Sequence, residues 1–282
     1  MPKIPKIAKD KIANEMYEAA ARQEKKSRNY LGMSEIGKAC GRAIWYNFRG
    51  FTPKEKEGRL LMLFRFGDRI EEEVIYHLTL AGYKVEGQQD YFEDMNGFFR
   101  GHCDGVIHGV TSRPHILEVK SANDKKFKMF QKKGVKAVYP VYYLQCQCYM
   151  GYAGLDRALV IVQNKNNSEL YTERIYFHKA DFSAIKERAK MIISANEPPA
   201  KLMNNKFECD WCDHRINCQY PEQRILKEKT CGTCYYLQFK GTRPYCCNPD
   251  HTFEIQRWGE CCPDWILFDT KEPIDKKRIK IK

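Results

Sequence analysis

The chain has 282 residues and a formal net charge of +12, from 48 Lys and Arg against 36 Asp and Glu. Its 43% hydrophobic content is that of an ordinary globular protein. No apolar run approaches the roughly 18 residues that a membrane-spanning helix needs, and the start, MPKIPKIAKD, lacks the apolar segment of a signal peptide. We therefore expect a soluble, cytoplasmic protein without a membrane partner, and the excess positive charge favours a polyanionic partner.

The pattern predicts four parts along the chain. They are a basic helical extension over 1–29, a large domain over 30–220, a cysteine-rich module over 221–270 and a basic tail over 271–282. The large domain opens with a predicted helix near 33–49, with Ser34 as its N-cap and Gly50 as its stop.

The next predicted helix is amphipathic and ends near Gly82. In FGDRIEEEVIYHL, Val74 and Ile75 lie three and four residues after Glu71, so this glutamate shares their inward-facing stripe. Gly67, one turn earlier, would allow a close approach. A carboxylate on a buried stripe indicates a metal ligand or the partner of a buried cation.

A β-meander follows, with a turn at Asn96-Gly97 and a last strand reading HILEVKSA. Because side chains alternate along a strand, Glu118 and Lys120 share one face. Asp104 ends the preceding run, in GHCDGVI, and can meet them across a hairpin. Buried together, two carboxylates can hold a divalent metal while the lysine orients a water molecule or a phosphate oxygen. The alternative is a solvated hairpin with an ordinary Glu–Lys pair.

Helices near 123–133 and 140–153, a hairpin, and a last helix near 181–195 complete the large domain. The helix PVYYLQCQCYMGY starts at Pro140 and carries Gln145 and Tyr149 on one face. The alternative for this pair is the edge of an amphipathic helix. The order helix, meander, helices, hairpin predicts an α/β fold with a mixed sheet flanked by helices, followed by the small C-terminal cysteine-rich metal-binding module.

In this order, G-x3-E, D, E-x-K and Q-x3-Y resemble the PD-(D/E)xK nuclease superfamily, in its RecB-like and lambda-exonuclease-like branches. The resemblance implies a restriction-endonuclease-like core that binds Mg²⁺ or Mn²⁺ and hydrolyses phosphodiester bonds. It implies that Lys120 stabilises the reacting phosphate or positions the water, and that Gln145 and Tyr149 contact DNA. The implied metal ligands are Glu71, Asp104, Glu118 and the carbonyl of Val119. Many iron–sulfur relatives have a histidine at the Glu71 position, so this glutamate is closer to the lambda-exonuclease branch.

Thirteen cysteines in a chain without signs of secretion favour metal binding over disulfides. The first cluster, CDWCDHRINC, supplies Cys209, Cys212 and Cys218, with the distant Cys40 or the local His214 as a fourth ligand. One cysteine before the nuclease core and three after it resembles the CRISPR-associated RecB-like exonucleases and other iron–sulfur nucleases. The resemblance implies a [4Fe–4S] cluster on the four cysteines, with zinc as the alternative.

The second cluster lies in the C-terminal module. Cys231 and Cys234 form a C-x2-C zinc half-site, and the adjacent pairs 246–247 and 261–262 each offer one further ligand. We choose Cys247 and Cys262 as those ligands, with His251 as a substitute and a disulfide or a second iron–sulfur site as alternatives.

The predicted activity is that of a Mg²⁺- or Mn²⁺-dependent DNA exonuclease acting in recombination, repair or phage DNA processing, with a recombination or repair protein as a possible partner. Two alternatives stay open: a sequence- or structure-specific endonuclease, and a non-catalytic metal-binding module that grips nucleic acid or protein. The sequence leaves strand polarity, DNA or RNA as substrate, and oligomeric state open.

Overall fold

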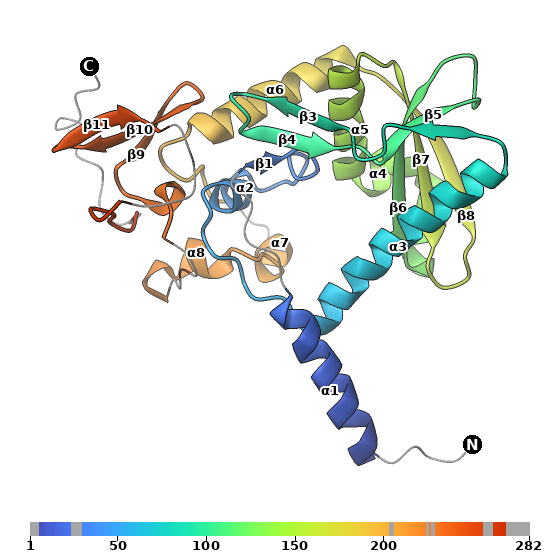
Figure 1. The fold of residues 1–282 in the computed structure, drawn as a ribbon, viewed down its shortest axis with the longest axis horizontal. Coiled ribbons are helices and arrows are strands. Elements are labelled where there is room, and N and C mark those ends of the chain that lie inside the picture. Colours follow the sequence, from blue (N-terminus) through green and yellow to red (C-terminus); the bar gives the residue numbers. More distant parts are fainter. Residues whose placement is uncertain are drawn as a thin grey trace.

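A five-stranded mixed sheet lies at one end of the molecule, on the right in Figure 1. The computed structural model describes residues 6–23, 30–202, 206–223, 226, 229–255 and 262–268. The strand order is β2-β5-β6-β7-β8, with β6 and β7 parallel and the other pairs antiparallel. The bounds are β2 (Lys84–Glu86), β5 (Gly105–His108), β6 (His115–Ala122), β7 (Arg157–Asn164) and β8 (Leu170–Tyr176). The mixed sheet predicted from the sequence is confirmed.

Helices cover both faces of this sheet. The long helix α3 (Gly58–Leu80) packs Ile70 and Val74 against Leu117 and Val119 of β6. On the other face, Ile116 joins a larger core with residues of α4 (Asp124–Val138) and α5 (Pro140–Ala153). The alternation of β6 therefore sends odd-numbered residues towards α3 and even-numbered residues towards α5, as the sequence predicts.

The predicted meander is divided between two sheets, which corrects the expectation of one continuous meander. β3 (Tyr91–Asp94) and β4 (Phe99–His102) form a hairpin that pairs with the short β1 (Leu31–Gly32), whereas β2 and β5 belong to the five-stranded sheet. The chain leaves β4 at Cys103 and enters β5 at Gly105. Gly105 has φ +154°, which favours glycine, so this change of direction has a local cause. The turn at Asn96-Gly97 is confirmed, since both residues have positive φ.

The helix expected near 33–49 begins later than predicted. Its helical part is α2 (Gly41–Phe48), and residues 33–39 form turns and bends instead. The N–H of Met33 donates to the carbonyl of Arg100 in β4 at 2.7 Å, so this backbone pairs with a strand and not with a helix. Ser34 is therefore no N-cap, and Cys40 occupies that position. Gly50 stops the helix with φ +80°, as expected.

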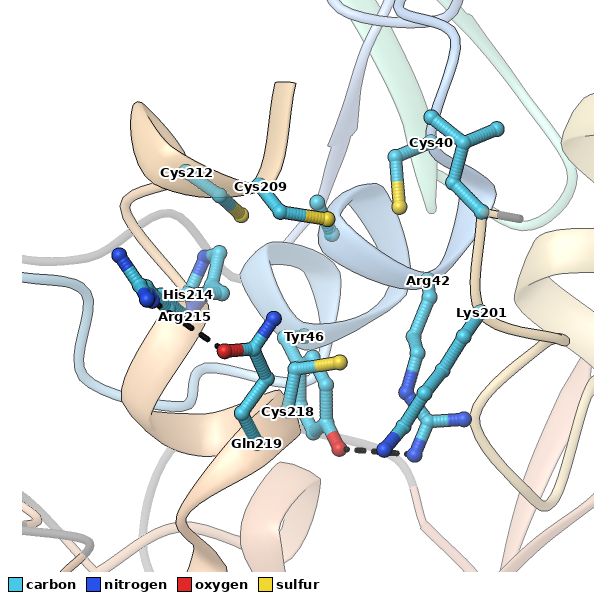
Figure 2. A pocket seen from close by; sticks show the side chains of 12 residues that line it. Cys40, Arg42, Tyr46, Lys201, Cys209, Cys212, His214, Arg215, Cys218 and Gln219 are labelled. Atoms are coloured by element: carbon cyan, nitrogen blue, oxygen red, sulfur yellow. Dashed lines mark hydrogen bonds between the residues drawn. The ribbon is translucent and has the colours of Figure 1, made fainter. Parts of the chain in front are cut away.

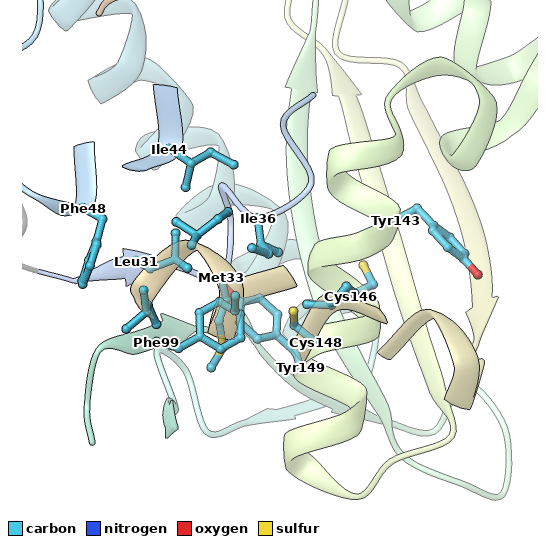
Figure 3. Close-up of a cluster of buried hydrophobic side chains, with 14 of the residues drawn as sticks. Leu31, Met33, Ile36, Ile44, Phe48, Phe99, Tyr143, Cys146, Cys148 and Tyr149 are labelled. Atoms are coloured by element: carbon cyan, nitrogen blue, oxygen red, sulfur yellow. The ribbon is translucent and has the colours of Figure 1, made fainter. Parts of the chain in front are cut away.

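The large core lies between α2, the three-stranded sheet β1-β4-β3 and α5 (Figure 3). Figure 3 shows Leu31 and Met33 beside Phe99 and Tyr149. Aromatic rings extend the core towards the C-terminal region, because Trp45 stacks on Phe51 at 5.9 Å and meets Phe268 edge-on at 5.6 Å.

Two further helices complete the outline of the large domain. α1 (Lys6–Arg22) contacts α3 and projects from the body of the molecule, and α6 (Lys179–Ser194) packs on α5 (Figure 1). Within the described residues, none of the helices combines the length and apolar character needed to cross a bilayer.

A small C-terminal sheet lies at the opposite end of the molecule from the five-stranded sheet (Figure 1). Its order is β11-β10-β9. The elements of this region are α7 (Lys206–Asp210), α8 (Arg215–Gln219), the 3-10 turns η1 (Pro221–Gln223) and η2 (Cys231–Thr233), β9 (Leu237–Lys240), β10 (Arg243–Asn248) and β11 (His251–Glu254).

Candidate active site and cysteine sites

Glu118 is the most deeply buried acid of the site. It is fully buried in the middle of β6, and Lys120 is the one described residue that contacts its carboxylate oxygens as a donor. Its one described partner is the ammonium group of Lys120, with which it forms an ion pair. Burial raises the pKa of Glu118 to about 8, although Lys120 opposes this rise. A buried carboxylate with so few partners is costly unless a cation neutralises it.

Lys120 is a protonated cation in this setting. Burial by itself would lower its pKa, but the carboxylates of Glu118 and Asp104 outweigh burial and hold the pKa above its usual value. The ammonium also lies 5.3 Å from the centre of the Tyr142 ring. A lysine that keeps its proton at neutral pH can stabilise negative charge but cannot accept a proton.

Asp104 is joined to the same strand by a backbone hydrogen bond. The break between β4 and β5 places it opposite β6, where its Oδ2 accepts the N–H of Val119 at 2.7 Å. Burial raises the pKa of Asp104, and Lys120 together with this hydrogen bond partly offsets the rise. The predicted meeting of Asp104 with Glu118 and Lys120 across a hairpin is therefore what the fold produces. The carbonyl of Val119 as a metal ligand stays a prediction.

Glu71 reaches the site from α3. Burial raises its pKa to about 7, and the nearby Asp104 carboxylate adds to the rise while Lys120 opposes it. Its Oε1 accepts a hydrogen bond from the Nε2 of Gln89 at 3.0 Å. Gln89 was missed from the sequence because it lies in the loop before β3, with φ +62°, where no periodicity marks it. Gly67 meets nothing within 4 Å, so the close approach expected there is absent.

Gln145 and Tyr149 lie beneath the site. The Nε2 of Gln145 donates to the hydroxyl of Tyr149 at 3.3 Å, and the two side chains are only 5% and 2% exposed. The Tyr149 ring packs on Phe92 at 5.9 Å and touches Met33 and Gly101 within the core. The shared face predicted from their spacing is therefore present, but this burial leaves little surface for a direct contact with DNA.

The acidic residues suit a hard divalent cation in their chemistry. Carboxylate oxygens are the donors that Mg²⁺ and Mn²⁺ prefer, and the unpaired oxygens of Glu118 face two further acids. In the described part of the chain, no three His, Cys, Asp or Glu side chains are grouped as one ion would hold them. The fit therefore rests on the donor types and on the buried, unpaired carboxylate.

The four cysteines of the first cluster line one cavity of about 90 Å³. Figure 2 shows Cys40, at the start of α2, facing Cys209, Cys212 and Cys218, which come from α7, α8 and the turn between them. The fold thus brings together the distant residue and the local trio. His214 also lines the cavity, with its Nδ1 3.0 Å from the Nδ2 of Asn217.

Cationic side chains surround this cavity. Arg42, Lys201 and Arg215 contribute to its wall, and Arg42 also donates to the carbonyl of Pro199 at 2.9 Å. Burial raises the pKa of the Cys212 thiol, and the nearby Cys40 and Cys218 thiols add to the rise. The cavity therefore gathers four thiols and three cations in one place.

In the C-terminal module, the structure separates the members of the first adjacent pair. The thiol of Cys246 is influenced electrostatically by those of Cys234 and Cys262. The thiol of Cys247 is influenced by that of Cys246. The choice of Cys247 as the partner of Cys231, Cys234 and Cys262 stays a prediction. Adjacent strand residues face opposite ways, and sequence alone could not say which way. Cys261 and the side chain of His251 lie outside the described residues.

A buried acidic cluster on a mixed sheet, with one lysine among three carboxylates, defines a candidate hydrolytic metal site. Residues 28–156, slightly less than half of the chain, match the family described as the YqaJ-like viral recombinase domain. This segment contains Glu71, Asp104, Glu118, Lys120, Gln145 and Tyr149. No curated protein matches the chain.

Solved structures with a similar arrangement are distant in sequence. The structure of SSO0001 has a TM-score of 0.47 at 13% identity, over 74% of this chain and 96% of that one. An alkaline exonuclease, LHK-Exo, from Laribacter hongkongensis has a TM-score of 0.45 at 15% identity, over 64% of this chain and 90% of that one. A phage-related exonuclease from Haemophilus somnus 129PT has a TM-score of 0.34 at 16% identity, over 67% of this chain and 86% of that one. At these scores the likeness carries no further argument, and the RecB-like iron–sulfur branch stays a prediction.

Proposed function

We propose that this chain is a metal-dependent nuclease that degrades DNA from its ends in phage-type recombination. The observation that carries the proposal is the fully buried Glu118 carboxylate, whose one partner among the described residues is the Lys120 ammonium and which lies beside Asp104 and Glu71. The match of residues 28–156 to a viral recombinase domain supports the same assignment. The net charge of +12 suits a polyanionic substrate.

The acidic residues hold the cation in this proposal. Asp104 and Glu118, with Glu71, bind Mg²⁺ or Mn²⁺, and such an ion lowers the pKa of water and neutralises charge on the phosphate. Asp104 also fixes the strand that carries Glu118, through its hydrogen bond to Val119. Gln89 holds the Glu71 carboxylate towards the site.

Lys120 acts as a fixed positive charge. Because its pKa lies above the usual value, it stays protonated and donates hydrogen bonds to the water or to phosphate oxygens, but does not remove a proton. Gln145 and Tyr149 are positioning residues in this proposal. Their hydrogen bond supports α5 behind Glu118, and bound DNA lies over the site and not against the buried phenol.

The cavity lined by Cys40, Cys209, Cys212 and Cys218 is the proposed site of a [4Fe–4S] cluster, with zinc as the alternative. Four thiols that share one cavity, with three cations in its wall, suit an anionic thiolate-bound cluster. Such a cluster would connect α2 with α7 and α8 and so close the domain. It has no step in the hydrolysis.

The test compares end-labelled linear DNA with covalently closed circular DNA, using anaerobically purified protein in Mg²⁺ and in Mn²⁺. We expect degradation of the linear DNA alone, and its loss in Lys120→Ala. Lys128→Ala is the matched control, because this exposed lysine pairs with Asp124 away from the site.

Each outcome of this test decides between functions. Cutting of the circular DNA would replace end-dependent digestion by endonuclease activity. Unchanged cleavage by Lys120→Ala would overturn the assigned site. No cleavage by folded wild type with either metal would favour a module that only binds nucleic acid or protein.

A further inference from the structure

A buried arginine connects the nuclease core with the C-terminal module. Arg49 follows α2 and is fully buried, and its Nε donates to the carbonyl of Gly232 at 2.5 Å. Its two terminal nitrogens have no hydrogen-bond partner among the described residues. The guanidinium lies 4.8 Å and 5.6 Å from the ring centres of Trp45 and Phe268. Rings alone compensate a buried cation only in part, so an anion is expected beside it.

The neighbour of this cation is the C-x2-C turn. Gly232 lies between Cys231 and Cys234, and the N–H of Cys234 donates to the carbonyl of Cys231 at 3.1 Å. The unpaired guanidinium nitrogens therefore lie at a pair of cysteines spaced as a zinc half-site.

Backbone hydrogen bonds bring a third cysteine to this turn. The N–H of Tyr235 donates to the carbonyl of Ile266 at 2.7 Å, and that of Phe268 donates to Thr233 at 2.9 Å. The N–H of Trp265 in turn donates to the carbonyl of Cys262 at 3.2 Å. The segment 262–268 thus runs along the turn, with Cys262 at its start.

The fourth cysteine comes from β10. Cys246 is opposite Leu237 in β9, which itself donates its N–H to the carbonyl of Cys234 at 3.3 Å. The buried Cys246 side chain belongs to the same core cluster as Leu237, and Cys231 packs against that cluster. Cys247, one residue on, faces the other side of the strand.

We propose that Cys231, Cys234, Cys246 and Cys262 bind one zinc ion and that Arg49 is the buried counter-charge of this site. Four thiolates around one Zn²⁺ leave two net negative charges, of which a buried guanidinium can balance one. The assignment rests on which thiols share a face and on the unpaired cation, because no three side chains in the described segments are already grouped around one point.

The proposed site has a structural role that is separate from hydrolysis. Arg49 and the rings of Trp45 and Phe268 belong to the same aromatic cluster at the edge of the main core. Zinc at this place would fix the module to α2, and the ion's charge would be compensated from the nuclease domain. The site therefore does not depend on the proposed nuclease activity.

The first experiment measures zinc and iron separately in full-length, anaerobically purified protein. We expect about one zinc ion per chain in wild type, as a site with four thiolates holds. Cys246→Ser should lose this zinc, whereas Cys247→Ser should retain it; both cysteines are buried and adjacent, so they form a matched pair. Equal retention, equal loss, or wild type without zinc would overturn the assignment.

The second experiment tests the counter-charge. Transfer of zinc to a competing chelator should show zinc affinity weaker by about 10- to 100-fold in Arg49→Met, as for outer partners of metal ligands. Arg49→Lys should lose less, because it keeps the charge. Arg157→Met is the control, since Arg157 is a half-buried arginine of β7 that bonds to Thr111 and lies outside both cysteine sites. Equal affinity in all four proteins would refute the role of Arg49.

A measurement on wild type covers the case in which the variants fail to fold. Zinc is exchanged for Co²⁺, and the absorption spectrum is recorded. Bands typical of tetrahedral cobalt with thiolate ligands would support the site if they are also present in Cys218→Ala, which lacks one thiol of the other cavity. A spectrum of cobalt with oxygen and nitrogen ligands only would reject it.

Discussion

The acidic site and the cavity lined by Cys40, Cys209, Cys212 and Cys218 differ in how the chain brings their residues together. The acidic site is built on one hairpin, β5–β6, and one neighbouring helix, and its carboxylates are held against each other by burial. The cysteine cavity joins a residue before the sheet with three residues after it. A site of the first kind concentrates charge, whereas a site of the second kind closes the domain.

Because of this difference, substitutions in the acidic site and in the cysteine cavity should have opposite effects on activity and on stability. Buried like charges destabilise a fold, so their removal should cost activity and not stability. A link between distant segments removes freedom from the unfolded chain, so its loss should cost stability first. The following predictions test that contrast.

The largest effect is expected from Glu118→Gln. Cleavage should fall by on the order of a hundred- to a thousandfold, as when a preorganised charged group at a reacting centre is lost. The melting temperature in EDTA should change little, because Lys120 keeps the nearby Asp104 carboxylate as its counter-charge. The measurements are cleavage rates and thermal unfolding, with the exposed Glu169→Gln as control. A large fall in melting temperature would remove the contrast.

The second largest effect is expected from Cys218→Ala. The protein should lose its iron and about 3 kcal/mol of unfolding free energy, as for a cross-link that closes a long loop. At low temperature, cleavage should be largely retained. Iron content, chemical unfolding and cleavage are compared with Cys148→Ala, a buried cysteine of α5 outside the cavity. Equal behaviour of the two variants would show that the cavity has no special role.

A smaller effect is expected from pH in EDTA. Burial raises the pKa of Glu71 to about 7 and of Glu118 to about 8, above their usual 4.5. The folded state therefore holds these protons more tightly than the unfolded state, and this stability is fully present below about pH 4.5. This stabilisation is lost as the pH rises through about 7 and 8. The free energy of unfolding should therefore fall as the pH rises from about 4.5 to about 8.

The same variants test this pH dependence. In Glu118→Gln the fall near pH 8 should be reduced, whereas Glu169→Gln should follow wild type. Chemical unfolding from pH 5 to pH 9 measures the difference. An unfolding free energy that rises with pH in wild type would contradict the assigned burial of the two acids.

The smallest effect is expected from Tyr149→Phe. It removes the hydrogen bond with Gln145 and should cost about 1 kcal/mol of stability, with a few-fold slower cleavage. Tyr143→Phe, on the same helix, removes a hydroxyl that bonds to Asp181 and should leave cleavage unchanged. Equal cleavage by both variants would show that Tyr149 does not position the site.

Local patterns predicted much of the fold and the acidic site. The alternation in HILEVKSA put Glu118 and Lys120 on one face, and helical spacing put Glu71 on the stripe of Val74 and Ile75. These predictions succeeded because the direction of a side chain in a regular helix or strand follows from the period of that element. Ser34 failed as a helix cap because the backbone at Met33 pairs with β4, a contact between distant residues.

The sequence by itself determined which residue types could do chemistry: three acids, one lysine and two sets of cysteines in a set order. The tertiary structure decided which of them meet. It divided the meander between two sheets, buried Tyr149, brought Cys40 to the same cavity as Cys209, Cys212 and Cys218, and placed Arg49 at the C-x2-C turn. The physical reason is that local periods fix the direction of a side chain, whereas burial and electrostatic partners depend on packing between segments far apart in the chain.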